Sequence, residues 1–429
     1  MRLINVKAFL DLDLQNFFQS DVIRHFGDEE LCGIQYATMS HCWCTAGLAE
    51  EIQFKELVEL NEATLETMRD LRNRPGYRKI VESCSLTRKE GLDWLWVDTC
   101  CIMRESKTEL SEAINSMFQW YRGSEICFAY LHDVKFPLLT RPGTEISHTS
   151  NDWSTWFSCS WTLQDLLGAR VIHFFDQDWH LIGDKDELTP KLTEITGIPE
   201  DVLANGLPHP DDPCRPSTAQ IMSWAANRKA TIREDRAYAL VGIFEVHMPT
   251  KYGENENAFR RLQMSIIKEY NDHSIFAWFG KARPGSILAD DPSYFRGSAD
   301  VVRLDPCDTF IRECPGANEC IEDHEFFEVT EEGVEIWLPI IFGHDSSFQR
   351  RVQAKLACCR ESQNGELVTL NLLSRLPNTC IRGFGPFYPH SKDLTFEKLR
   401  LALNDNDFKK SSQSCGTVHG GRHIRFVSH

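Results

Sequence analysis

The sequence predicts an α/β fold with a mostly parallel sheet flanked by helices, followed by a helical segment and a smaller β-rich C-terminal region. Three changes of pattern lead to this prediction. Short apolar runs alternate with helical stretches between residues 36 and 176, helical periods dominate residues 217 to 271, and period-two alternation returns after residue 290. At roughly 150 residues per domain, the 429-residue chain has room for about two to three domains.

Four short apolar runs in the first part are the predicted strands. They are Ile34–Ser40, Trp94–Val97, Ile126–Leu131 and Val171–Phe175. Helices are expected over Phe54–Asn73 and Tyr77–Lys89, separated by the helix-breaking pair Pro75-Gly76. A further helix should begin after Ser106, which opens a capping box with Glu109.

The domain boundaries follow from the same changes of pattern. Alternating leucines and aspartates from Leu10 to Leu14 predict a half-buried strand near the N-terminus. The predicted parts are an N-terminal strand and lead-in over 1–35, an α/β domain over 36–205, a helical region over 206–280, a β-rich region over 281–404 and a flexible tail over 405–429.

Composition and missing motifs exclude several classes of protein. The 46 Lys and Arg residues against 63 Asp and Glu residues leave a charge of −17, and such a surface repels nucleic-acid phosphates. The sequence contains no apolar run of about 20 residues and no signal peptide, which predicts a cytoplasmic protein without a membrane span. P-loop, zinc-protease and α/β-hydrolase motifs are also missing from the sequence.

The sixteen cysteines are expected to be reduced thiols, because the chain is long and shows no export signal. His41-Cys42-x-Cys44 has no fourth ligand at metal-binding spacing, so no metal site is predicted. One alternative function is a redox sensor built on the adjacent pairs Cys100-Cys101 or Cys358-Cys359, although nothing in the sequence indicates a lowered thiol pKa.

Polar residues follow the predicted strands, where open parallel sheets bind their ligands. These residues are Ser40-His41-x-Trp43, Asp98-Thr99-Cys100, His132-Asp133 and Asp176. Together their hydroxyl, imidazole and carboxylate groups would suit a polar small molecule. A second cluster, Trp161-Thr-Leu-Gln-Asp165, could line a pocket for a planar ring. The structural alternative is that these aspartates cap helices and the tryptophans fill gaps between layers.

Several segments, taken in order, carry a family resemblance. They are Tyr36-Ala-Thr-Met-Ser-His-Cys-Trp43, Gly91-Leu-Asp-Trp-Leu-Trp-Val-Asp-Thr-Cys-Cys-Ile102, Glu109–Tyr121 and Trp161-Thr-Leu-Gln-Asp165. This text resembles the fungal heterokaryon incompatibility (HET) domain family. Met222–Ala226, Arg233–Tyr238, Gly242–Phe244 and Tyr252–Glu254 look like the region that follows HET domains in basidiomycete members. The resemblance covers about residues 1 to 280.

The resemblance implies an effector of fungal non-self recognition that triggers cell death. It also implies a flavodoxin-like fold similar to Toll/interleukin-1 receptor (TIR) domains, and partners that are further copies of the chain or other HET-like or TIR-like signalling proteins. Some TIR domains cleave NAD. By that analogy of fold the chain would be an NAD glycohydrolase, with NAD as its substrate and no bound cofactor.

Cleavage of NAD leaves an oxocarbenium-like ribose, which a carboxylate can stabilise. The catalytic candidates are Asp98, Asp165 and Glu105. The candidates for substrate binding are Ser40, His41, Trp43, Trp161, Thr162 and Gln164.

This chain departs from the usual family text at several such places. Cys44 stands where a glycine is usual, and Met103-Arg104 replaces an acidic-basic pair. Cys159-Ser160 replaces Arg-Gly, and Asp165 replaces a glutamate. Because these changes remove an arginine and shorten a carboxylate, they favour the alternative of a non-catalytic signalling or assembly module without NAD-cleaving activity.

Overall fold

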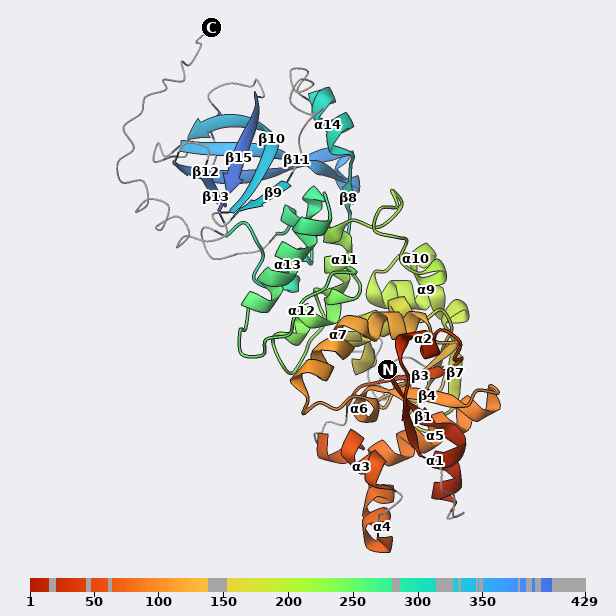
Figure 1. The fold of residues 1–429 in the computed structure, drawn as a ribbon. Helices are drawn as coiled ribbons and strands as arrows, with labels where there is room; N and C mark the ends of the chain where they lie inside the picture. Colours follow the sequence, from red (N-terminus) through yellow and green to blue (C-terminus); the bar gives the residue numbers. More distant parts are fainter. Residues whose placement is uncertain are drawn as a thin grey trace. The chain divides into compact units, whose positions relative to one another are not determined.

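Figure 1 shows the fold in a computed structural model. The structure describes residues 1–14, 21–43, 48–60, 64–137, 153–279, 286–313, 327–330, 333–344, 346, 350–376, 379–382, 388–389 and 395–402. Two compact units divide the chain. The first comprises Met1–Pro216, Gln220–Ile266 and Asp291–Ala299, and the second comprises Ser217–Ala219, Ile267–Asp290 and Asp300–His429.

The first unit is built on a seven-stranded sheet with the order β2-β1-β4-β3-β5-β6-β7. Its strands are β1 (Arg2–Asn5), β2 (Ile23–His25), β3 (Ala37–His41), β4 (Trp94–Val97), β5 (Ile126–Tyr130), β6 (Ile172–Phe175) and β7 (Leu181–Asp184). The four central strands are parallel, while β1, β2 and β7 run antiparallel to their neighbours. The sequence prediction of a mostly parallel α/β sheet is therefore confirmed.

The parallel strands follow the flavodoxin-like order, because β4 lies on one side of β3 while β5 and β6 lie on the other. All five residues of β3 are buried, as expected for a strand covered on both faces. In this arrangement the chain reverses its direction of winding at β3 and β5. Such a switch point leaves a crevice at the carboxyl ends of the strands, where ligands bind in folds of this type.

Helices of the first unit lie before and between these strands. They are α1 (Val6–Asp13), α2 (Asp28–Leu31), α3 (Phe54–Glu59), α4 (Leu65–Asn73), α5 (Pro75–Lys89), α6 (Asp98–Cys101), α7 (Lys107–Arg122), α8 (Thr162–Gly168), α9 (Lys185–Thr196) and α10 (Glu200–Asn205). Ser106 caps α7, as predicted, by accepting from the Glu109 backbone N–H at 3.3 Å. Pro75 occupies the first turn of α5, where its missing N–H leaves no bond unmade.

Gly76 brings a distant segment against α5. A Cβ at this position would lie 2.6 Å from the Glu50 carbonyl oxygen and 2.6 Å from the Glu51 Cα. Only glycine permits this approach, and it places Glu51 over the first turns of the helix.

One prediction near the N-terminus is wrong. Residues Val6–Asp13 form helix α1, where the alternation from Leu10 to Leu14 predicted a strand. The Asn5 side chain caps the helix by accepting from the Ala8 backbone N–H at 3.0 Å, and Phe9 and Leu10 are buried. This local cap and the apolar face outweigh a short period-two pattern. The actual N-terminal strand is β1, directly before the cap.

The predicted helical segment contains three α-helices, α11 (Thr218–Ala225), α12 (Asp235–Val241) and α13 (Asn257–Glu269). Their predicted apolar faces are buried, including Ile221 and Trp224 on α11 and Phe259 and Leu262 on α13. Helix α12 belongs entirely to the first unit. Side chains from this segment are thus available to the α/β sheet.

The second unit carries an eight-stranded, mainly antiparallel sheet and helix α14 (Pro306–Glu313), which confirms the predicted β-rich region. Its strands are β8 (Val301–Arg303), β9 (Phe327–Thr330), β10 (Gly333–His344), β11 (Arg350–Arg360), β12 (Glu366–Leu376), β13 (Thr379–Arg382), β14 (Tyr388–Pro389) and β15 (Thr395–Leu401). Pairing of β10 with both β15 and β11 closes the sheet on itself. The predicted tail over 405–429 lies outside the described residues.

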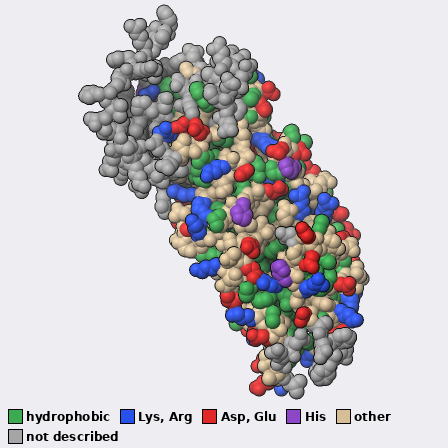
Figure 2. Space-filling model, viewed as in Figure 1, with side chains coloured by type: hydrophobic (Ala, Val, Ile, Leu, Met, Phe, Trp, Pro, Cys, Tyr) green, Lys and Arg blue, Asp and Glu red, His purple; other side chains and the backbone are tan. Residues whose placement is uncertain are grey.

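The described surface mixes charges and isolated apolar side chains. On the face shown in Figure 2, Lys and Arg side chains are interspersed with Asp and Glu. Exposed large apolar residues, such as Leu14, Phe136 and Ile311, are far apart in the sequence. Among the helices that the structure describes, none is long and apolar enough to cross a membrane.

Candidate functional site at the strand ends

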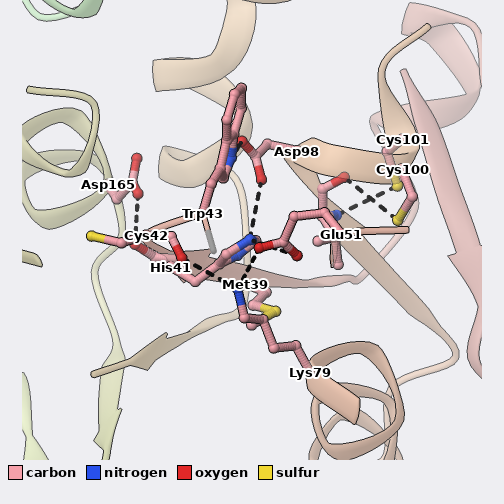
Figure 3. Close-up of polar contacts among 12 residues, drawn as sticks. Met39, His41, Cys42, Trp43, Glu51, Lys79, Asp98, Cys100, Cys101 and Asp165 are labelled. Atoms are coloured by element: carbon pink, nitrogen blue, oxygen red, sulfur yellow. Dashed lines mark hydrogen bonds and ion pairs between the residues drawn. The ribbon is translucent and has the colours of Figure 1, made fainter. Parts of the chain in front are cut away.

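The carboxyl ends of β3 and β4 bring together most of the predicted site residues. Ser40 and His41 end β3, and Asp98 follows β4 as the first residue of α6. Asp165 joins them from α8. Figure 3 shows His41 between Asp98 and Asp165, with Trp43 beside Asp98. The structure therefore supports the prediction that these side chains converge.

Trp43, Asp98 and Arg104 form the first half of the cluster, here called the Asp98 corner. The Trp43 indole N–H donates to Asp98 Oδ2 at 2.8 Å, and Arg104 Nη2 lies 3.4 Å from the same oxygen. The Arg104 guanidinium also lies over the Trp43 ring, 4.0 Å from its centroid, in a cation–π contact. Because the Asp98 side chain is 17% exposed, the corner reaches solvent.

His41, Glu51 and Lys79 lie beneath this corner (Figure 3). Lys79 Nζ donates to Glu51 Oε1 at 2.6 Å and to the Cys42 carbonyl at 3.2 Å. His41 Nε2 lies 3.8 Å from Glu51 Oε2 and 4.0 Å from Asp98 Oδ1, beyond hydrogen-bond range. Burial, reinforced by the Lys79 charge, lowers the pKa of His41 to about 4, so the imidazole is neutral at neutral pH.

Ser40, Trp156 and Asp165 form the second half, here called the Asp165 corner. The Ser40 hydroxyl donates to Asp165 Oδ2 at 2.6 Å and accepts from the Trp156 indole N–H at 2.8 Å. Burial raises the pKa of Asp165 well above its usual range, and the Asp98 charge acts in the same direction. This shift favours the protonated acid over the carboxylate.

The other predicted binding residues, Thr162, Gln164 and Trp161, differ in the contacts that they make. Thr162 Oγ1 donates to the backbone carbonyls of Trp156 and Cys159, so its hydroxyl holds the turn before α8. Gln164 is fully buried, and neither polar atom of its amide has a hydrogen-bond partner among the described residues. The Trp161 side chain acts on the pKa of Asp235, which it lowers against the effect of burial.

Glu105 does not join the cluster. Its carboxylate pairs with Lys55 at 3.2 Å on the surface, and its side chain is 52% exposed. Its own backbone N–H and then Lys55 hold the pKa of Glu105 below its usual range. This geometry does not support the prediction of Glu105 as a catalytic residue. After α6 the chain places Glu105 at the surface beside Lys55, while Asp98 stays in the cluster.

Two residues that the sequence argument missed come from the helical segment. Asp235 begins α12, where it accepts from the Tyr252 hydroxyl at 3.0 Å. Arg228 is buried and donates to the Cys159 carbonyl at 2.8 Å and to Thr162 Oγ1 at 3.0 Å. Burial raises the pKa of Asp235 and lowers that of Arg228 to about 10.

Arg228 and Asp235 change the interpretation of the site that the sequence alone gave. Cys159 replaces an arginine of the usual family text, yet Arg228 brings a guanidinium to the same turn from a distant segment. The Arg233–Tyr238 and Tyr252–Glu254 segments are joined to one another by the hydrogen bond from Tyr252 to Asp235. Their polar, motif-like text was the only sequence signal that could have pointed to them.

The described cysteines are all free thiols, as predicted. The adjacent pairs do not have the character of redox sensors, because burial raises the pKa of Cys100 and of Cys358 well above the usual range. Cys44, from the His41-Cys42-x-Cys44 cluster, lies outside the described residues.

Metal-ligand geometry occurs at Asp176, Asp178 and His180 within the described part of the chain. Asp176 accepts from the backbone N–H groups of Phe136, Asp178 and His180 at 2.8 to 2.9 Å. These bonds give the carboxylate a structural role in the turn after β6.

Two cavities border the first unit, and both lie away from the two corners. One of about 260 Å³ is lined by residues that include Arg2, Cys101 and Glu109, and one of about 460 Å³ by residues that include Glu56 and Asp70. Neither is lined by a residue of the Asp98 or Asp165 corner. A planar ligand at Trp43 would have to displace Arg104 from the ring face.

Comparison with known proteins covers the part of the chain that contains the Asp98 corner. The family model "Heterokaryon incompatibility protein (HET)" matches residues 36–153, from the start of β3 to the segment before α8. Over 235 residues the chain is 37% identical to "Vegetative incompatibility protein HET-E-1" of Podospora anserina, a match that covers 54% of this chain and 16% of that protein. No solved structure matches significantly. Residues 36–153 therefore match the heterokaryon incompatibility (HET) domain family, and the chain is similar to a vegetative incompatibility protein over 54% of its length.

Proposed function

We propose that the chain is an effector of fungal vegetative incompatibility whose HET domain triggers cell death when incompatible cells fuse. The observation that carries this proposal is the 37% identity over 235 residues with a vegetative incompatibility protein. The match spans 54% of this chain but only 16% of that protein, and the HET family model separately covers residues 36–153, within the first unit. The proposal therefore assigns the effector role to the first unit.

Two routes from this unit to cell death differ in what they require of the strand-end cluster. Cleavage of NAD requires a carboxylate beside the ribose, an aromatic ring for nicotinamide and a cation for the phosphates. Asp98, Trp43 and Arg104 supply one group of each kind. In this reaction water would attack the ribose carbon, the bond to nicotinamide would break, and neutral nicotinamide, ADP-ribose and a proton would be released.

The second route is a non-catalytic signal passed on by assembly with further HET-like or TIR-like proteins. Two observations favour this route. Arg104 lies over the Trp43 ring that a nicotinamide would stack on, and Asp165 is a buried group whose Oδ2 is hydrogen bonded to Ser40. We therefore propose assembly as the principal route and NAD cleavage as the second candidate.

An inducible expression experiment tests both the function and the route. The full chain is expressed in a fungal or yeast host while growth and cellular NAD are followed together. The test variant is Asp98→Asn, which keeps the size of the side chain but removes its charge. Glu105→Gln is the matched control, since it makes the same chemical change at an exposed carboxylate outside the cluster.

We expect growth arrest with the wild type and with Glu105→Gln, without an early fall in NAD. Arrest preceded by NAD loss that Asp98→Asn abolishes would replace the assembly route by the enzymatic one. Normal growth on expression of well-folded wild-type protein would contradict the effector function itself.

A further inference from the structure

A cavity of about 260 Å³ in the first unit is lined by residues of β1, β2 and α7 and by the end of α6. Because β1 runs antiparallel to β4, the start of β1 lies at the edge of the sheet where β4 ends. Open parallel sheets bind their ligands at this edge. The cavity contains no residue of the Asp98 or Asp165 corner, so an inference about it does not depend on the proposed function.

The lining of the cavity carries charges of both signs. Arg2 pairs with Glu109, whose Oε1 also accepts from the Met103 backbone N–H at 2.9 Å. Glu112 is exposed and makes no ion pair or hydrogen bond with the residues that the structure describes. This carboxylate is therefore available to a positively charged group of a ligand.

The start of α7 forms the positive side of the same cavity. Thr108 lies in the first turn of this 16-residue helix, where the helix dipole places a partial positive charge. Arg2 carries five N–H donors, and its contact with Glu109 uses only some of them. An anionic group of a ligand can consequently be bound by Arg2 together with the Thr108 hydroxyl.

The positive and negative sides are close together. Thr108 and Glu112 are four residues apart on α7, so their Cβ atoms lie about 6 Å apart on one face of the helix. A lone anion such as phosphate would be repelled by Glu112, and a lone cation would be repelled by Arg2 and the helix dipole. The lining therefore favours a ligand that carries opposite charges close to one another.

The other walls of the cavity are apolar. Trp120 lines it, and the Trp120 ring makes an edge contact with Trp96 at 5.6 Å between ring centroids. Ile102 and Ala113, which are almost fully buried, line it as well. A volume of about 260 Å³ is below the roughly 300 to 1,000 Å³ of sites for drug-sized ligands, so the ligand must be small.

We propose that this cavity binds a free amino acid in its zwitterionic form, with an apolar side chain. The carboxylate of the amino acid lies against Arg2 and Thr108 at the start of α7, and its ammonium group pairs with Glu112. Its side chain packs on the wall that contains Trp120. A peptide does not meet this description, because its two charged ends are on different residues.

The test is a saturation-transfer NMR titration of the purified full chain with three probes that share a phenyl ring. L-Phenylalanine carries both charges, phenethylamine lacks the carboxylate and 3-phenylpropanoate lacks the ammonium group. We expect L-phenylalanine to bind saturably with a Kd of about 1 mM or below. Each of the other two probes should bind at least about tenfold more weakly, because each loses a charged hydrogen-bonding group.

The variant Glu112→Gln locates the binding site. It should weaken the binding of L-phenylalanine at least about tenfold while leaving the Kd of 3-phenylpropanoate unchanged or lower. Glu90→Gln is the matched control and should bind all three probes like the wild type, because Glu90 is exposed and lines neither cavity.

Three results would overturn the proposal. They are no saturable binding of L-phenylalanine to the wild type, equal binding of the three probes, and an unchanged Kd of L-phenylalanine in folded Glu112→Gln. The comparison of the three probes uses the wild type alone, so it decides the question even if a substitution impairs folding.

Discussion

The Asp98 and Asp165 corners contain the same kind of side chain in different environments. Asp98 lies at a strand end, partly open to solvent, and pairs with Arg104 and Trp43. Asp165 lies in α8, where every residue is buried, and its Oδ2 accepts from the Ser40 hydroxyl. Burial favours the neutral form of a carboxyl group and raises the pKa of Asp165. The difference teaches that environment, not residue type, sets the chemistry of each aspartate.

The same difference separates a candidate for chemistry from a structural element. The hydrogen bonds from Trp156 to Ser40 and from Ser40 to Asp165 Oδ2 hold β3 against α8. An anion at the solvent edge can contact a ligand or a partner. Substitution of Asp98 is therefore the most informative functional test within the cluster.

The largest effect on stability is expected beneath the Asp98 corner. Lys79→Met removes the cation that pairs with Glu51 while both side chains are almost fully buried, at 6% and 2% exposed. Leaving one buried charge without its partner costs about 3 to 5 kcal/mol of unfolding free energy. Denaturant unfolding of the purified variant measures the loss.

The double variant Lys79→Met, Glu51→Gln is the control, because it removes both charges together. It should recover at least half of the lost free energy. A single variant as stable as the wild type would show that Glu51 and Lys79 are hydrated rather than buried.

A smaller effect is expected at the Asp165 corner, and it should depend on the substituent. Asp165→Ala removes the acceptor of the Ser40 hydroxyl inside the core, which should lower the free energy of unfolding by about 2 kcal/mol. Asp165→Asn keeps an acceptor oxygen at the same place and should remain within about 1 kcal/mol of the wild type. Thermal unfolding of the two variants side by side gives the comparison. Equal loss in both would mean that Asp165 acts as a carboxylate after all.

The unfolding free energy should depend on pH with opposite signs at Asp165 and at His41. The pKa of Asp165 is raised by folding, so its contribution is complete below the unfolded value of 3.8 and is lost as the pH rises. Asp165→Asn should therefore gain stability relative to the wild type between about pH 4 and pH 7. His41 acts in the opposite direction, since its pKa falls from 6.5 to about 4 and its contribution is lost as the pH falls through that window.

Thermal unfolding at several pH values, for the wild type and Asp165→Asn, tests the first of these signs. The titratable groups that the two proteins share contribute equally to both melting temperatures, so their effect cancels in the difference. A difference that stays constant from acid to neutral pH would contradict a raised pKa at Asp165.

Much of the α/β part could be predicted from the sequence because its strands are short, apolar and fully buried. Trp94–Val97 has the predicted bounds, and β3, β5 and β6 differ from prediction by no more than a few residues at their ends. The segment from Leu10 to Leu14 failed because alternation over five residues also fits one face of a short helix. A helix forms there instead, because the Asn5 side chain caps its N-terminus.

The candidate site was only partly predictable for a different reason. Strand-end residues such as Ser40 and Asp98 follow from the rule that parallel strands present their carboxyl ends at one edge. Arg228 and Asp235 come from a segment whose position beside α8 depends on tertiary packing and leaves no local sequence pattern. The sequence likewise could not show that Glu105 pairs with Lys55 at the surface, because the two residues are far apart in the chain.

The smallest losses of unfolding free energy are expected from substitutions within the Asp98 corner. Trp43→Phe keeps a ring beneath Arg104 but loses the N–H that donates to Asp98, which should cost about 1 kcal/mol. Arg104→Lys keeps a cation but loses the planar group that stacks on the ring, at a cost of about 0.5 to 1 kcal/mol. Chemical unfolding of each single variant and of the double variant gives their coupling. Non-additive losses would show that the ring, the cation and Asp98 act as one unit, whereas simple addition would mean that Arg104 can leave Trp43 at little cost and open the ring face to a ligand.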